Sequence, residues 1–173
     1  MVDMQYENVI FPNSKGFHCR KCGMCCRNQP PDINFKEQKR IQAAGYKNFM
    51  QDPANPKNRN IHRKKDGSCF FFTKENTCEI NSIKPSICFL EPFIIADFDY
   101  STNKIYLDLN PYAVNNCKGI LTEENVASEE IGKAAQTIVS DCLEIVAEKT
   151  GLPVTNKIVA FLARQLLNDS NFI

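Results

Sequence analysis

The stretch Phe17-His18-Cys19-Arg20-Lys21-Cys22-Gly23-Met24-Cys25-Cys26 decides how the rest of this 173-residue chain must be arranged. It carries four cysteines within eight residues, in the spacing C-x2-C-x2-C-C. A hydrophobic core does not need thiols crowded into one loop. A metal site does, because thiolates are strong, soft ligands and close spacing lets one loop supply several of them. The stretch therefore predicts a metal–thiolate site.

A second set of cysteines recurs at wide intervals, in the spacing C-x8-C-x9-C-x28-C. Most of its members lie in or beside turn-rich segments, where side chains from distant parts of the chain can converge. Together with the first four they give up to eight candidate metal ligands: Cys19, Cys22, Cys25, Cys26, Cys69, Cys78, Cys88 and Cys117. The ninth cysteine, Cys142, lies on an apolar helical stripe and is predicted to be an ordinary core residue.

The adjacent pair Cys25-Cys26 bears on how many metal centres there are. Neighbouring side chains on an extended chain point to opposite sides, so these two thiolates are better placed to serve two centres than one. Eight thiolates shared equally would then give two centres with four cysteines each. A single multinuclear site is the alternative, and one metal equivalent lost from Cys25→Ser would distinguish the two.

The identity of the metal stays open. The spacing C-x2-C-x2-C resembles the first three ligands of a bacterial ferredoxin, but the expected x3-C-P does not follow. The spacing C-x2-C suits zinc equally well, and thiolate-only ligation fits both metals. His18 next to the loop is a further candidate ligand or proton donor, whereas His62 is the weaker of the two histidines. Glu91, Asp97 and Asp99 are polar groups that could face a metal, but none forms a motif, and no catalytic residue is identified.

Composition limits the function classes. With 21 Lys and Arg against 20 Asp and Glu, no overall field attracts nucleic acid or an anionic membrane. The basic segment 57–65 is better interpreted as a solvated arm than as a nucleic-acid patch. No apolar run reaches 18 residues and the first five residues do not resemble a signal peptide, so we expect a cytoplasmic protein. Cysteines in that compartment stay reduced, which favours metal binding over disulfides.

We expect an α+β fold with short antiparallel strands in a cysteine-rich metal-binding lobe that packs against C-terminal helices. The chain should form one domain over residues 1–173, with the ligand region at 17–120 and a helical part at 121–173. Capping signals predict a helix from Asn34 to Ala44 that stops at Gly45. Residues 68–73 are a β-prone run, strands are expected at 93–98 and 104–109, and C-terminal helices are expected from Thr122 and Thr155.

At this point the sequence resembles the YkgJ-like cysteine-cluster family, a zinc- or iron-chelating domain named after its CxxCxxCC motif. The resemblance spans about residues 17 to 125. It rests on Cys19-x2-Cys22-x2-Cys25-Cys26, Cys69 before aromatic residues, Cys78-Glu79-Ile80, Lys84-Pro85-x2-Cys88, Pro92-Phe93 and Cys117-Lys118-Gly119-Ile120. Asn81, Lys84 and Phe89 depart from the family's usual Tyr, Arg and Arg. The cysteines are therefore what the resemblance carries over, as metal ligands.

The resemblance implies a metal-binding protein, and family members are usually described as iron–sulfur oxidoreductases or metal-binding proteins of unassigned reaction. The first hypothesis is therefore an iron–sulfur or iron protein with a redox role, including an oxidoreductase, that works with a redox or protein partner. The alternative is a structural zinc-binding interaction module. A third hypothesis is methyl transfer, because one branch of the family resembles the longer flagellin lysine N-methylases. No membrane partner is expected, and nucleic acid is not favoured as a partner.

Overall fold

The computed structural model describes residues 8–12, 16–17, 19–28, 30–55, 59–121 and 129–168. The chain has the expected α+β fold. Its helices are α1 (Met24–Asn28), α2 (Phe35–Ala43), α3 (Ser86–Leu90), α4 (Pro111–Asn116), α5 (Glu129–Thr150) and α6 (Lys157–Asn168), with a 3-10 turn at Asn81–Ile83. Its strands are β1 (Val9–Ile10), β2 (Gly16–Phe17), β3 (Phe93–Asp99), β4 (Lys104–Leu109) and β5 (Ile120–Leu121). Within this part of the chain, no helix has the length and apolar character to cross a membrane.

A three-stranded sheet in the order β1-β4-β3 forms one half of the molecule. Strands β3 and β4 are an antiparallel hairpin, as expected, and β1 joins β4 in parallel with Val9 opposite Ile105. Alternate residues of β4 (Ile105, Leu107 and Leu109) are buried and those between them are exposed. This period of two lets one face of the sheet pack against helices while the other meets solvent.

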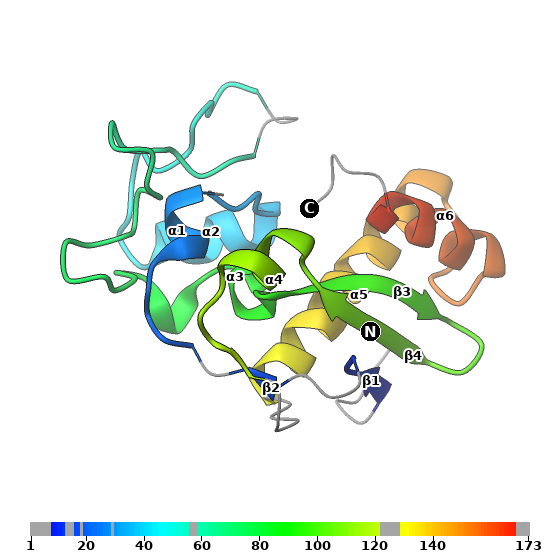
Figure 1. The fold of residues 1–173 in the computed structure, drawn as a ribbon. Coiled ribbons are helices and arrows are strands. Elements are labelled where there is room, and N and C mark those ends of the chain that lie inside the picture. The colour runs from blue at the N-terminus through cyan, green and yellow to red at the C-terminus, as the bar shows by residue number, and fades with distance from the viewer. Residues whose placement is uncertain are drawn as a thin grey trace.

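The long helix α5 supplies the other side of this first core. It crosses behind the sheet, and α6 lies beside it (Figure 1). Residues one and two turns apart on α5, among them Ala135, Val139, Cys142 and Val146, are fully or nearly fully buried against the sheet and α6. Cys142 is thus a core residue, which confirms the sequence prediction. The predicted start of this helix at Thr122 lies outside the described residues.

The buried face of α6 does not contain all of its large apolar residues. Ile158 and Phe161 are 57% and 60% exposed. Small residues replace them in the interface, where Ala160 and Ala163 are buried together with Val159 and Leu167. Alanine lets α6 approach the hairpin and α5 closely, so the helix is rotated relative to the stripe that hydrophobicity alone selects.

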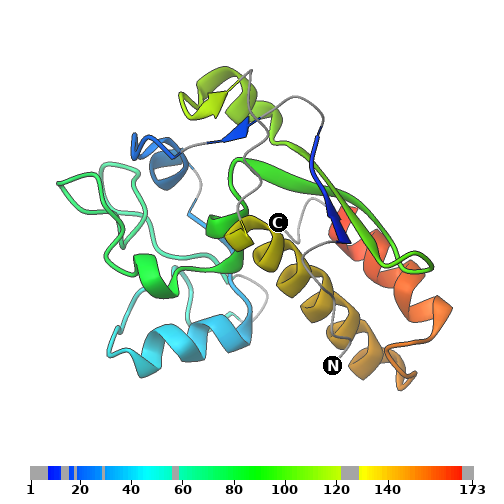
Figure 2. The ribbon, with the colours of Figure 1, turned by 90° about the horizontal axis from the view of Figure 1, so that it is seen from below.

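The cysteine-rich lobe contains a second, separate hydrophobic core. Ile41, Phe49, Ile61, Phe71 and Ile80 form its centre, and three cysteines pack into or against it. Figure 2 shows α2 and the loops that follow it on one side of the molecule, with the sheet, α5 and α6 on the other. Outside its short helices, isolated bridges such as Met50–Ile61 and Phe72–Cys78 hold this lobe together.

The β-prone run at 68–73 forms turns and single bridges and does not form a continuous strand. The backbone turns at Phe70 and Phe71, and Phe72 N–H donates to Cys69 at 3.0 Å. The consecutive rings of Phe71 and Phe72 are both buried, which alternation along a strand packed on one side would not allow. The predicted Asp66-Gly67 turn is present, and Asp66 accepts from both the backbone and the hydroxyl of Ser68.

Helix α2 connects the lobe to α5. The capping box predicted at its start is present, because the Asn34 side chain accepts from Glu37 N–H while Glu37 accepts from Asn34 N–H. Asn34 also donates to Asp141 of α5 at 2.7 Å, and Lys36 pairs with Asp141 and Glu144. These polar contacts fix the lobe against the helix whose other face forms the first core.

Glu37 provides a test of this connection. Its buried carboxylate accepts from Asn34 N–H at 3.1 Å and from Ser86 N–H at 2.7 Å, so it ties the start of α2 to the start of α3. We expect Glu37→Ala to lower the free energy of unfolding by about 2–4 kcal/mol, since two backbone donors lose their acceptor. Urea unfolding measures this loss. Glu148→Ala on exposed α5 surface is the control, with an expected change within about 0.5 kcal/mol; equal effects of the two variants would contradict the assignment.

Candidate metal centre

The cysteine loop is built around helix α1. Gly23 is buried with a φ of +73°, and its carbonyl accepts from Arg27 N–H at 2.9 Å. Cys25 and Cys26 are therefore on a helix, whereas the sequence argument assumed an extended chain. Successive side chains on a helix diverge by about 100° instead of 180°. The conclusion that Cys25 and Cys26 face different surroundings still holds, with this smaller angle as its cause.

Cys26 lies in the neighbourhood of three cysteines from later segments. We call these four the inner set: Cys26, Cys69, Cys78 and Cys88. Cys69 N–H donates to the Cys26 carbonyl at 2.7 Å, so the backbone joins these two positions. Cys78 lies across a bridge from Phe72, and Cys26, Cys69 and Cys78 all belong to the hydrophobic core of the lobe. Cys88 comes from α3, just after the turn that follows Cys78.

Electrostatic interactions support the grouping of the inner set. Burial raises the pKa of the Cys26 thiol to about 12, with further contributions from Cys25, Cys78 and Cys69. Burial likewise raises the pKa of Cys88 well above its usual range, and Cys69, Cys26 and Cys78 add to the effect. Coulomb interactions weaken with distance, so these cysteines lie in one neighbourhood. Cys25 and Cys19 also raise the pKa of Cys26, so the outer set lies close to the inner one.

The remaining candidates form an outer set: Cys19, Cys22, Cys25 and Cys117. Strands β2 and β5 pair antiparallel with Phe17 opposite Ile120, and continuing this register beyond the strands brings Cys19 beside the Cys117 segment. Helix α4, which leads to Cys117, lies beside α1 because the Tyr112 hydroxyl is 3.7 Å from the sulfur of Met24.

The electrostatics of the outer set agree with this placement. Cys25 is exposed as a residue, but protein atoms surround its thiol group, and this desolvation raises its pKa to about 11, followed in size by the effects of Glu91, Cys117 and Cys19. The pKa of Cys117 is raised by burial and by the charges of Cys22 and Cys19. Cys19, Cys22 and Cys25 are all exposed, whereas Cys69 of the inner set is buried. The outer set is therefore the more exposed of the two, although Cys117 is partly buried like Cys26, Cys78 and Cys88.

Neither set has its side chains arranged in a coordination geometry. All nine cysteines are free thiols, and within the described ranges no three Cys, His, Asp or Glu side chains come together closely enough to hold an ion. The donors nevertheless fit zinc or iron chemically, since both metals accept ligation by thiolates alone. The inner and outer sets are the residues that would hold such centres.

The structure places the acidic residues named in the sequence analysis in two different environments. Glu91 is half-buried near Cys25, and burial raises the pKa of its carboxyl. Asp97 pairs with Arg164 of α6 at 2.5 Å, and Asp99 accepts from Ser101 and Thr102 in the hairpin turn. The Asp97 side chain therefore joins the hairpin to α6, and the Asp99 side chain stabilises the hairpin turn. His18 lies outside the described residues.

The basic segment has a structural role where it is described. Arg59 donates to the Ile33 carbonyl at 2.8 Å and to Gln38 at 2.7 Å, and Lys64 donates to the Phe72 carbonyl. His62 is exposed and packs edge-on against Phe70. These contacts support the interpretation as an arm of the lobe; residues 57–58 lie outside the described part.

Comparison with known proteins identifies the class. Residues 18–110 match the CxxCxxCC family, described as "Putative zinc- or iron-chelating domain", and the chain belongs to this family. It is also similar to an uncharacterized protein of Methanocaldococcus jannaschii, with 26% identity over 138 residues that cover 75% of this chain and 72% of the relative. No solved structure matches the chain.

Gly23 offers a test of how α1 positions the cysteines. A methyl group added there would lie 2.9 Å from Cε2 of Phe72 and closer still to Cζ, and the φ of +73° disfavours any side chain. We expect Gly23→Ala to lower the free energy of unfolding by about 3 kcal/mol and to reduce the metal content, because strain and overpacking add.

Gly151→Ala is the matched control for this variant. Gly151 has a similar φ of +69°, but nothing lies within 4 Å of an added methyl group. Its backbone strain should cost about 1 kcal/mol and leave the metal content unchanged. Denaturant unfolding together with elemental analysis measures both effects. Equal losses of stability and metal in the two variants would show that the Phe72 contact does not position the loop.

Proposed function

We propose that the protein is a metal–thiolate protein with two centres, the inner one structural and the outer one redox-related, and that iron or iron–sulfur is the resident metal form. The observation that carries this proposal is the different surroundings of the adjacent Cys25 and Cys26. In addition to burial, Cys117 and Cys19 raise the pKa of Cys25. Besides burial, Cys78 and Cys69 of the inner set raise that of Cys26, together with the nearby Cys25 and Cys19. Four cysteines in each set match the four thiolates that a zinc ion or an iron–sulfur cluster takes.

The inner set supports a structural role for its metal. It lies against the core of a lobe that is built from short helices, loops and isolated bridges. A thiolate-bound metal can contribute on the order of 10 kcal/mol to folding. Binding at Cys26, Cys69, Cys78 and Cys88 would join α1, two loops and α3 at one point.

The outer set supports exchange with a partner or reagent. Three of its thiols are exposed, and Arg20, Lys21 and Lys118 are exposed beside them. These cations would offset the negative charge of several thiolates. When bound there, an iron–sulfur cluster would supply one-electron redox chemistry. The Glu91 carboxyl lies near Cys25, where it can accept or donate a proton beside the centre.

The iron form is tested directly by analysis of protein purified without oxygen. We expect broad visible absorbance, iron, and acid-labile sulfide. Colourless protein with zinc as its sole metal would overturn the redox role and would leave the structural zinc module as the function. The exposure of the outer thiols would then have no redox purpose. Iron without sulfide would support an iron site that lacks bridging sulfide.

The two-centre arrangement predicts distinct outcomes for neighbouring substitutions. Cys25→Ser should reduce the bound metal by the content of one centre, because only the outer set loses a ligand. Cys26→Ser should also remove one centre, and should lower the free energy of unfolding more, because the inner centre supports the lobe core.

Elemental analysis and denaturant unfolding of both variants measure these effects. Cys142→Ser is the control: its thiol is buried in the first core, so it should keep the full metal content while losing some stability. Loss of all metal from Cys25→Ser would point to one multinuclear site.

A further inference from the structure

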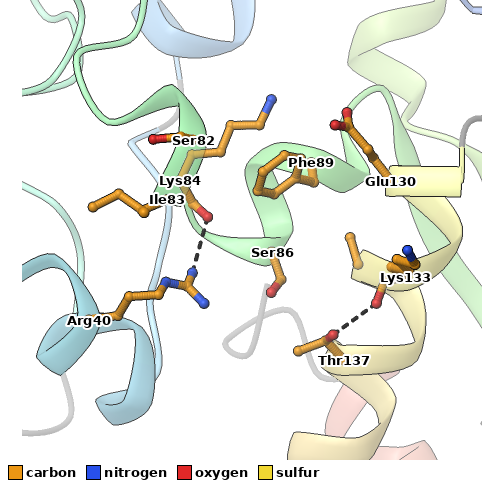
Figure 3. Close-up of a pocket in the computed structure, with 10 residues that line it drawn as sticks. Arg40, Ser82, Ile83, Lys84, Ser86, Phe89, Glu130, Lys133 and Thr137 are labelled. Atoms are coloured by element: carbon orange, nitrogen blue, oxygen red, sulfur yellow. Dashed lines mark hydrogen bonds between the residues drawn. The ribbon is translucent and has the colours of Figure 1, made fainter.

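A cavity of about 320 Å³ lies where the cysteine lobe meets α5 (Figure 3). Three elements enclose it: the last turn of α2, the segment from the 3-10 turn into α3, and the first half of α5. In the described part of the chain its lining residues are Arg40, Ser82, Ile83, Lys84, Ser86, Phe89, Glu130, Lys133, Ala134 and Thr137. Its volume falls at the lower end of the range for small-molecule sites.

Cations from all three elements border this cavity. Arg40 comes from α2, Lys84 from the turn before α3, and Lys133 from α5 (Figure 3). One lining residue is acidic, Glu130. The three positive charges around the cavity repel one another. An anion bound between them would be attracted by all three and would offset this repulsion.

Contacts within the protein position these cations. The Lys84 carbonyl accepts one N–H of Arg40 at 3.1 Å and so engages one of the five donors of its guanidinium. Glu37 lies 4.0 Å from Arg40, but its two oxygens already accept from Asn34 N–H and Ser86 N–H. Lys133 pairs with Glu129 one turn earlier on the exposed surface, an interaction that contributes little and is readily exchanged.

The remaining wall is apolar on one side and hydroxylic on the other. Ile83, Phe89 and Ala134 supply apolar surface, and the Lys84 ammonium lies 4.2 Å from the centre of the Phe89 ring. Ser82 and the buried Ser86 supply hydroxyls that can donate to an oxyanion. The cavity thus combines charge for an anionic group with an aromatic face for a planar or apolar body.

We propose that this cavity binds a small organic anion, with its carboxylate or phosphate group between Arg40, Lys84 and Lys133 and its apolar part against Phe89. The Glu130 carboxylate borders the same cavity and repels a negatively charged ligand, so it disfavours ligands with several negative charges. Cys88 lies on the same short helix as Ser86 and Phe89 but is not among the lining residues. The thiols therefore do not line the cavity. Burial raises the pKa of Cys78 and Cys88, but Lys84 lies close enough to these two thiols for its charge to lower the pKa of both.

Calorimetric titration of the full chain, purified with its metal, tests the proposal with three probes of one shape. Phenyl phosphate and benzoate carry the two candidate anionic groups, and benzamide is the neutral analogue. We expect at least one anion to bind and benzamide to bind at least tenfold more weakly. Tighter binding of phenyl phosphate would assign a phosphate ligand, and tighter binding of benzoate a carboxylate.

Substitutions locate the binding. Arg40→Gln and Lys133→Gln should each weaken the preferred anion about tenfold or more, and Glu130→Gln should strengthen it, because the first two remove attraction and the third removes repulsion. Lys133→Gln is informative even if Arg40→Gln disturbs the Lys84 backbone. Lys149→Gln, at the exposed far end of α5, is the control for the change in charge and should bind as the wild type does.

Three results would overturn the proposal. One is the absence of binding by both anions at millimolar concentration. Another is equal binding of benzamide, and the third is an affinity that Lys149→Gln lowers as much as Lys133→Gln. Metal content measured on every sample separates loss of this site from damage to the cysteine centres.

Discussion

Gly23 lies directly against the ring of Phe72, and this contact determines where the first four cysteines can go. The left-handed backbone at Gly23 turns the chain from the Cys19–Cys22 segment into α1. The ring occupies the space that any side chain at this position would need, so the turn packs directly on the core of the lobe. Cys25 and Cys26 follow on adjacent positions of α1, where the angle between their side chains divides the thiols into two sets.

The fold places these sets at different depths. The inner set packs on the hydrophobic core of a lobe with few regular strands, so a metal there would replace contacts that longer strands normally provide. The outer set lies between α1 and the β2–β5 pair, with exposed thiols. Asp141 of α5, which pairs with Asn34 and Lys36, holds this lobe against the sheet and long helices. The cavity beside α3 arises at the same junction.

The sequence predicted the elements whose signals are local. Asn34 and Glu37 identify the start of α2 because each caps the other within one turn. The alternation from Lys104 to Leu109 identifies β4, since one of its faces is buried. The list of eight clustered cysteines also follows from spacing, and it remains a prediction that all eight bind metal.

Features that depend on distant packing were beyond that reasoning. The spacing of the cysteines does not reveal that Cys117 belongs to the outer set. The β2–β5 pairing that brings Cys117 there involves strands of only two residues, which are too short to show a sequence pattern. The alanine-rich face of α6 was missed because hydrophobicity ranks Phe161 above Ala163, whereas close packing favours the smaller residue. The cationic cavity was missed because Arg40, Lys84 and Lys133 are far apart in sequence and form no motif.

The most direct test of the two-centre account is to follow the alkylation of every cysteine by mass spectrometry while a chelator slowly removes the metal. The account predicts two groups: Cys19, Cys22, Cys25 and Cys117 become reactive first, and Cys26, Cys69, Cys78 and Cys88 follow together. Cys25 and Cys26 would then be modified at clearly different rates despite their adjacency. Exposure of all eight thiols in one step, with Cys25 and Cys26 at the same rate, would contradict it.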